Sequence, residues 1–184
     1  MIIAVFGSSG AGKTYLLNEA LKSGFSLKKP AALTTRPRRQ GIDEHLDRIF
    51  LDDDSFDREL NNDRLCLINH VYGYRYAYYK KDILNCDIII ETHSREYQEL
   101  EELSDKLVSI YLKPNSLGTA YRQVISRHNG EIDRMAEIEE ENKILERFAT
   151  QHLFDYVVVN DYTETGRDNF RSCTNRRKRG IMRA

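Results

Sequence analysis

The feature that most constrains this chain is a short apolar run that ends at a glycine-rich turn. Residues 2–6 read IIAVF, the next eight read GSSGAGKT, and apolar residues at helical spacing follow. A continuous apolar run of this length is typical of a strand covered on both faces, as in a parallel sheet flanked by helices. Glycine loses conformational entropy wherever its backbone is fixed, so three glycines this close together indicate a backbone that a ligand approaches closely.

Residues 7–14 match the pattern G-x-x-x-x-G-K-[ST] and lie between an expected strand and an expected helix, which is the context this phosphate-binding motif requires. Backbone N–H groups of such a turn curve around a polyphosphate, and the helix N-terminus adds partial positive charge. The Lys13 ammonium then reaches the outer phosphates, and the Thr14 hydroxyl suits Mg²⁺. The alternative is a glycine-containing turn with a chance lysine. We predict a triphosphate site built from Ser9, Gly10, Ala11, Gly12, Lys13 and Thr14.

Further apolar runs predict an α/β fold of the P-loop NTPase type, with a parallel sheet flanked by helices. The expected strands are 2–6, 87–91, 107–112 and 156–160, and the expected helices are 13–22, 94–103, 116–127 and 136–150. The last of these, which contains EIEEENKILERF, is expected to be an exposed charged helix. Residues 34–80 do not follow the pattern and predict an inserted acceptor-binding lobe. Residues 126–136 predict a mobile lid.

Composition limits the classes of partner. The 184 residues hold 28 basic and 29 acidic side chains, so no global field draws the protein to nucleic acid or membrane. No apolar run approaches the roughly 20 residues that span a bilayer. The three cysteines show no metal-ligand spacing and are expected to be reduced thiols. We expect one soluble, cytoplasmic domain over residues 1–161, followed by a poorly ordered basic tail at 162–184 whose RRKR lacks the aromatic platform of a nucleic-acid site.

A second anion site is predicted by TTRPRRQG, which places Arg36, Arg38 and Arg39 within four positions. Three guanidinium groups this close repel one another unless an anion lies among them, and the arginine fork suits bidentate phosphate contacts. The alternative is a solvated basic turn. Beside a triphosphate site, the cluster favours phosphoryl transfer between two bound molecules.

Five segments then resemble the guanylate kinases in order and in approximate spacing: SSGAGKTYL, TTRPRRQG, GYRYAYY, DIIIE and FDYVVVND. The resemblance covers residues 1 to about 161. It implies transfer of the γ-phosphoryl group of ATP, with Mg²⁺, to a nucleoside monophosphate, with GMP or dGMP as the first candidates. No side-chain nucleophile is implied, because the acceptor's own phosphate oxygen attacks.

The resemblance also assigns roles to individual residues. It implies that Lys13 and the lid arginines stabilise the charge of the transferring group, that Thr14 meets the metal, and that Asn160 lies beside the adenine of ATP. The lid arginines are Arg122, Arg127 and Arg134, with Glu140 at the second lid position if the spacing is counted from FDY instead. The acceptor-binding residues are Arg36, Arg39, Arg48, Tyr76, Tyr78 and Glu91.

The sequence departs from the family where the acceptor base is read. The family's guanine-reading glutamate falls at Leu67 and its small hydroxyl residue falls at Tyr78, and neither replacement makes the same hydrogen bonds. A shift of one or two residues would bring Asn69 or His70 into place. Loss of guanine specificity is therefore a hypothesis. It leaves ribose 1,5-bisphosphate or a modified nucleotide as alternative acceptors.

Other departures are smaller. The proline follows Arg36 instead of preceding the second arginine, Arg48 replaces a phosphate-contacting tyrosine, and the first acid of the family's D-x-D falls at Ile89. A further alternative from another class is a non-catalytic binding module of the same fold. Such domains commonly lack an intact phosphate-binding loop, whereas Lys13 and Thr14 are both present here.

Overall fold

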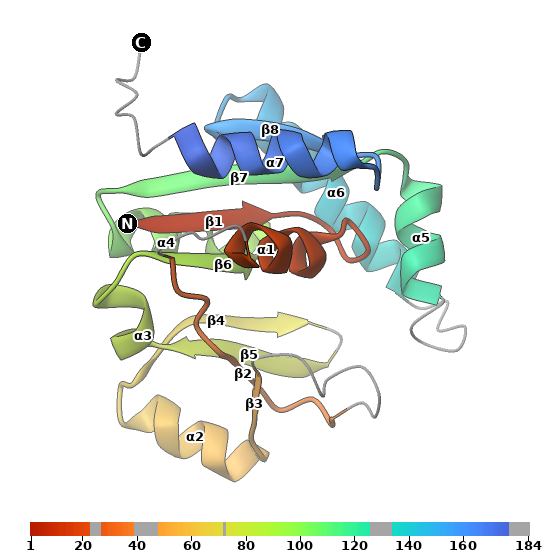
Figure 1. Ribbon diagram of the computed structural model, residues 1–184. Helices are drawn as coiled ribbons and strands as arrows, with labels where there is room; N and C mark the ends of the chain where they lie inside the picture. The colour runs from red at the N-terminus through yellow and green to blue at the C-terminus, as the bar shows by residue number, and fades with distance from the viewer. Residues whose placement is uncertain (23–26, 39–47, 72, 126–133, 177–184) are drawn as a thin grey trace.

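The computed structural model describes residues 1–22, 27–38, 48–71, 73–125 and 134–176. Its centre is a four-stranded parallel sheet in the order β6-β1-β7-β8 (Figure 1). The strands are β1 (Ile2–Phe6), β6 (Ile88–Thr92), β7 (Leu107–Pro114) and β8 (Tyr156–Asn160). They coincide with the four apolar runs to within two residues, so the expected α/β class is confirmed.

Helices cover both faces of this sheet, with α1 and α7 in front and α4 and α6 behind in Figure 1. The bounds are α1 (Lys13–Lys22), α4 (Tyr97–Leu103), α5 (Leu117–Ile125), α6 (Arg134–Thr150) and α7 (Glu164–Arg176). Alternate residues of β1 enter two apolar clusters, Ile3 and Val5 on the α1 and α7 side, Ile2 and Phe6 on the α4 and α6 side. This two-sided burial is why β1 reads as an unbroken apolar run.

A second sheet lies below the first in Figure 1, with the strand order β3-β2-β5-β4. Its elements are β2 (Ala32–Thr34), β3 (Arg48–Phe50), α2 (Asp53–Asn61), β4 (Leu65–Val71), β5 (Tyr74–Tyr79) and α3 (Lys80–Leu84). One face packs on α2 through Phe56, Leu33 and Ala77. The other face joins the core of the parallel sheet through Cys66, Leu67 and Tyr78. The sheet therefore has an outer face under α2 and an inner face toward the parallel sheet.

The parallel register brings the carboxyl ends of the strands to one edge. Phe6 pairs with Thr92 of β6 and Tyr111 of β7, and Pro114 of β7 pairs with Asn160 of β8. The phosphate-binding loop leaves β1 at this edge, and the short 3-10 turn η2 (Ser94–Glu96) follows β6 there. Segments that are far apart in the sequence are thus brought together around the loop.

The expected poorly ordered tail is wrong for residues 164–176, which form α7 against β8 and α1 (Figure 1). The Phe170 side chain is fully buried among Leu16, Leu17 and Val158, with Cys173 packed beside it. One aromatic ring among mostly polar residues gives a weak periodic signal, so the sequence did not reveal this helix. The RRKR segment lies outside the described residues beyond Arg176.

No helix among the described residues is long and apolar enough to cross a membrane. Cys66, Cys86 and Cys173 are all free thiols. Burial raises the pKa of the Cys66 thiol to about 12, so this thiol stays protonated and serves as a small core residue.

Truncating Phe170 tests whether α7 is an integral part of the fold. We expect Phe170→Ala to lower the free energy of unfolding by about 3–5 kcal/mol, since it leaves a cavity between the helix and the sheet. The exposed neighbour Asn169, changed to Ala, is the matched control. Urea unfolding followed by circular dichroism measures both, and equal stabilities of the two variants would contradict the packing of α7.

Candidate active site

The turn between β1 and α1 takes a shape that only glycine adopts without strain at two positions. Gly10 and Gly12 have φ values of 83° and 91°, in the left-handed region. A Cβ atom on Gly12 would lie 2.4 Å from Nδ2 of Asn160, and one on Gly10 would lie 2.3 Å from the carbonyl oxygen of Ala120. The loop is therefore held closely between β8 and α5.

Asn160, at the end of β8, holds the backbone of this loop in place. Its side chain is buried, Nδ2 donates to the Ala11 carbonyl at 2.9 Å, and Oδ1 accepts from the Tyr162 N–H at 2.9 Å. The Tyr162 hydroxyl donates to the Gly10 carbonyl. The role that these contacts define is support of the loop, and the expected contact of Asn160 with adenine stays a prediction.

Lys13 begins α1 and points back into the loop, where Nζ donates to the carbonyl oxygens of Gly7 and Ser8, at 3.2 Å in the second case. Burial lowers the pKa of Lys13, while the negative charges of Glu91, Glu141 and Glu96 raise it. A polyphosphate beside Nζ would add negative charge and favour the ammonium form.

Thr14 and Glu91 come together at the N-terminus of α1, although 77 positions separate them in sequence. The Thr14 hydroxyl donates to Oε2 of Glu91 at 2.9 Å, and Lys29 Nζ lies 3.7 Å from Oε1. Hydroxyl and carboxylate oxygens are ligands that Mg²⁺ accepts. Among the described residues no group of three or more His, Cys, Asp or Glu side chains forms a metal site, so phosphate oxygens would have to complete the coordination.

The arginine cluster lies at the end of β2. Arg36 is only 6% exposed, its N–H donates to the Thr34 hydroxyl at 3.1 Å, and its guanidinium donates to the Pro37 carbonyl at 2.7 Å. The guanidinium carbons of Arg36 and Arg38 lie 5.5 and 4.5 Å from the centroid of the Phe50 ring. Arg39 falls outside the described residues.

Arg48 links the second sheet electrostatically to the phosphate-binding loop. It begins β3 and is partly buried. The pKa of Lys13, lowered chiefly by burial, is lowered further by the positive charge of Arg48. Lys13 begins α1 after the phosphate-binding loop, and Arg48 begins β3 of the second sheet. The interaction is repulsive, and an anion between them would relieve it.

The side chains of Tyr78 and Leu67 are both buried in the protein interior. The Tyr78 hydroxyl donates to the Glu91 carbonyl at 3.1 Å, and burial raises its pKa. Leu67 is 1% exposed in the apolar core at a bulge in β4, with φ of 51° and its N–H bonded to Oε1 of Glu99 at 2.8 Å. Tyr76 instead pairs with Thr34 and Asn69 on the inner face of the second sheet.

The expected lid is largely outside the described residues. Arg127 lies in the segment 126–133, which is outside the described residues. Arg134 is the first residue of α6, and only its backbone is described. Arg122 is exposed on α5 and donates to the Thr119 hydroxyl at 3.1 Å within its own helix. Glu140, the alternative second lid residue, is exposed on α6. Their roles stay predictions.

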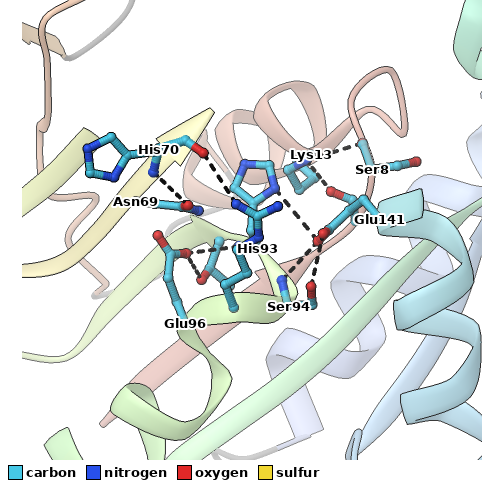
Figure 2. A network of polar contacts seen from close by, with 11 residues as sticks. Ser8, Lys13, Asn69, His70, His93, Ser94, Glu96 and Glu141 are labelled. Atoms are coloured by element: carbon cyan, nitrogen blue, oxygen red, sulfur yellow. Dashed lines mark hydrogen bonds and ion pairs between the residues drawn. The ribbon is translucent and has the colours of Figure 1, made fainter. Parts of the chain in front are cut away.

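The sequence analysis missed a polar network behind Lys13 (Figure 2). Glu141 of α6 accepts hydrogen bonds from the Ser94 N–H at 2.8 Å and hydroxyl at 2.9 Å, and His93 Nδ1 lies 3.7 Å from Oε1. Burial alone would raise the pKa of Glu141, but His93 and Ser94 outweigh it and lower the pKa to about 2.

The expectation of an exposed charged helix is therefore wrong for Glu141, which is partly buried and bonded to Ser94. A signal existed in the sequence: Ile138 and Leu145 are buried on α6, and Glu141 lies between them at helical spacing, on the same face.

A glycine-rich loop closing on a partly buried lysine, a hydroxyl and carboxylate pair at the helix N-terminus, and a second lobe with an arginine cluster are the parts of a P-loop phosphotransferase. The family model described as guanylate kinase matches residues 1–174. The chain belongs to the guanylate kinase family, and the family supports a kinase that acts on nucleoside monophosphates.

Individual guanylate kinases resemble this chain in sequence and in fold. A guanylate kinase of Coxiella burnetii is 28% identical over 87% of this chain and 79% of its own length, and one of Nitrosococcus oceani is 27% identical over 96% and 89%. The crystal structure of guanylate kinase from Anaplasma phagocytophilum superposes with a TM-score of 0.75 at 20% identity, covering 98% of this chain and 87% of that one. This structural likeness shows the fold.

The carboxylate of Glu141 gives a pH-dependent test of the network. Its pKa of about 2 in the folded protein lies below the ordinary value of 4.5, so its stabilisation is fully present above pH 4.5 and is lost as the pH falls toward 2. We expect Glu141→Gln to lower the free energy of unfolding by about 1–3 kcal/mol at pH 7. The difference in the free energy of unfolding between this variant and wild type, measured by urea titration, should shrink as the pH falls from 4.5 toward 2. A difference that does not vary with pH would contradict the assignment, and the exposed Glu140→Gln is the control.

Proposed function

We propose that the protein transfers the γ-phosphoryl group of ATP to the phosphate of GMP or dGMP. The observation that carries this proposal is that Glu91 bonds both Thr14, next to Lys13 in the phosphate-binding loop, and Tyr78 of the sheet that carries Arg48, which joins two cationic elements. A site for two phosphorylated molecules explains why a fold would bring such charges together. The family of the chain supports the same reaction.

The reaction requires positioning and charge stabilisation and no covalent step on the protein. In a loose transition state the negative charge spreads over the oxygens of the transferring group, and fixed cations lower the barrier. Lys13 serves the donor phosphates, while Arg36, Arg48 and Tyr76 hold the acceptor phosphate, which supplies the attacking oxygen. Arg39 and the lid arginines Arg122, Arg127 and Arg134 complete the charge stabilisation and the exclusion of water.

Mg²⁺ fits the donor set at the start of α1. Thr14 and Glu91 are the residues that would hold it. When bound, the ion would neutralise part of the negative charge of the triphosphate. Glu91 also anchors Tyr78 through its carbonyl, so the same residue fixes the inner wall of the acceptor lobe.

A second candidate acceptor is favoured by the burial of Leu67 and Tyr78. Neither side chain offers a free polar group to guanine, so the family's usual base recognition is absent at these two positions. Ribose 1,5-bisphosphate or a modified nucleotide remains an alternative substrate for the same phosphate sites.

A screen of ADP release with ATP and each acceptor separates these candidates. The panel is GMP, dGMP, the other nucleoside monophosphates and ribose 1,5-bisphosphate. The proposal expects the largest kcat/KM with GMP or dGMP. Turnover of ribose 1,5-bisphosphate with none for any nucleotide would overturn it, and absence of ATP binding by calorimetry would favour the non-catalytic module.

Removing either phosphate-site cation should abolish turnover without unfolding the chain. We expect Lys13→Ala and Arg36→Ala each to lower kcat/KM by roughly 1,000-fold or more, because a fixed charge at the transferring or accepted phosphate is lost. Arg58→Ala is the control, since Arg58 lies exposed on α2 in the same lobe and its guanidinium donates to the Ser55 hydroxyl of the same helix. Unaltered steady-state kinetics in Lys13→Ala or Arg36→Ala, with thermal midpoints like that of wild type, would remove these assignments.

A further inference from the structure

Lys29 places an ammonium group against the carboxylate of Glu91. The Lys29 side chain is 12% exposed and the Glu91 side chain is 19% exposed. Nζ of Lys29 lies 3.7 Å from Oε1 of Glu91 and donates a hydrogen bond to Oδ1 of Asn18 at 3.0 Å. The Thr14 hydroxyl donates to Oε2, the other oxygen of the same carboxylate. Both oxygens of Glu91 are therefore held, one by a hydroxyl group and one by an ammonium group.

The backbone beside Lys29 is fixed along the edge of β6 that faces away from β1. The Lys28 carbonyl accepts a hydrogen bond from the Ile89 N–H at 2.9 Å, and Lys28 pairs with Ile88 in the parallel direction. Because the two segments run in the same direction, Lys29 lies further toward the carboxyl end of β6, where Glu91 is found. Main-chain pairing therefore places the start of the Lys29 side chain beside this carboxylate.

Helix α1 supplies the other two side chains. Thr14 and Asn18 are one helical turn apart and lie on the same face of α1, which packs against β6 (Figure 1). On β6, Glu91 is two residues after Ile89, which is buried in the apolar cluster that contains Leu17 of α1. Side chains two residues apart on a strand share a face, so Glu91 lies on the face that α1 covers. We call this cluster the carboxylate clamp; its members are Thr14, Asn18, Lys29 and Glu91.

The direction of the Thr14 hydrogen bond decides what the clamp can do. A hydroxyl group has one proton to donate and two lone pairs that can accept a hydrogen bond or bind a metal ion. Because the Thr14 proton is donated to Glu91, the lone pairs of Oγ1 are left for another partner. A carboxylate that turned away would no longer hold the proton in this direction. Groups that orient a metal ligand in this way typically contribute about 10- to 100-fold to metal affinity.

We propose that Lys29 is a positioning residue of the donor site, which holds Glu91 in the orientation that leaves the Thr14 lone pairs to the divalent cation of the nucleotide. Asn18 shares this role, because its carboxamide oxygen holds the Lys29 ammonium group in place. The inference deepens the proposed function and rests on it for the Mg²⁺ of the same site. It requires that nucleotide and metal bind, and it does not depend on which acceptor is used.

A purely electrostatic role of Lys29 makes the opposite prediction. A positive charge 3.7 Å from Glu91 weakens the attraction of this carboxylate for a divalent cation. Replacing Lys29 by an uncharged residue would then strengthen metal binding. In the positioning role the same replacement weakens metal binding, because Glu91 loses one of the contacts that fix its orientation. The sign of the change therefore distinguishes the two roles.

The test measures the Kd of ADP by calorimetry, once in EDTA and once in saturating Mg²⁺. The first Kd divided by the second is the factor by which the metal strengthens nucleotide binding. We expect Lys29→Met, which keeps a long side chain without its charge, to lower this factor about 10-fold. Asn18→Ala keeps both charges of the ion pair and should lower the factor about 3-fold, since one hydrogen bond is lost. Lys28→Met is the matched control, because Lys28 is the exposed neighbour of Lys29, and it should leave the factor unchanged.

A double variant tests whether Lys29 and Asn18 act through the same contact. If they do, their effects do not add, and the variant that carries both substitutions should match Lys29→Met. Thermal midpoints show whether each variant folds. If Lys29→Met does not fold, Asn18→Ala carries the test, because it leaves the ion pair of Lys29 with Glu91 in place.

The outcomes separate this inference from the proposed function. If wild type binds no ADP, both fail. If wild type binds ADP more tightly with Mg²⁺ but phosphorylates no nucleoside monophosphate, the proposed function fails and the inference is still tested by the variants. A factor that is unchanged or raised in folded Lys29→Met would overturn the inference and leave the proposed function standing. A factor of about one in wild type would also overturn it, because no metal effect would then exist for Lys29 to support.

Discussion

The hydrogen bond from Asn160 to the Ala11 carbonyl is the contact on which the rest of the site depends. It ties the end of β8 to the phosphate-binding loop at the end of β1, and the tight space beside Gly12 leaves no room for a side chain there. β8 in turn is held by β7 and by α7. The shape of the loop therefore depends on the packing of the whole parallel sheet, including a helix far along the chain.

The second sheet is positioned against this loop by the same edge of the parallel sheet. Glu91, the penultimate residue of β6, accepts a hydrogen bond from Thr14 through its side chain and one from Tyr78 through its carbonyl. The segment after β6 reaches α6 through Ser94 and Glu141. One strand end thus connects the donor site, the acceptor lobe and the helix that follows the expected lid.

The sequence alone predicts the elements that have a local pattern of apolar residues or a motif. It does not predict the elements whose position depends on contacts with distant segments of the chain. The strands of the parallel sheet and α1 could be read because burial on both faces leaves continuous apolar runs, and because the loop motif fixes where α1 begins. The docking of α7 through Phe170 and the inward position of Glu141 on α6 depend on partners that lie on other elements. The pairing of Asn69 with Tyr76 across β4 and β5 could not be predicted either. The bulge that sets this register is a property of the sheet and has no sequence signal of its own.

The central claim is that the loop of Lys13 and the lobe of Arg36 and Arg48 bind two phosphorylated molecules at once. The most direct measurement is calorimetric binding of a bisubstrate compound in which adenosine and guanosine are joined through five phosphates. Linking two ligands makes the second binding event intramolecular, so the account predicts one site per chain and a Kd at least about 100-fold below that of ATP. A Kd equal to that of ATP would contradict it.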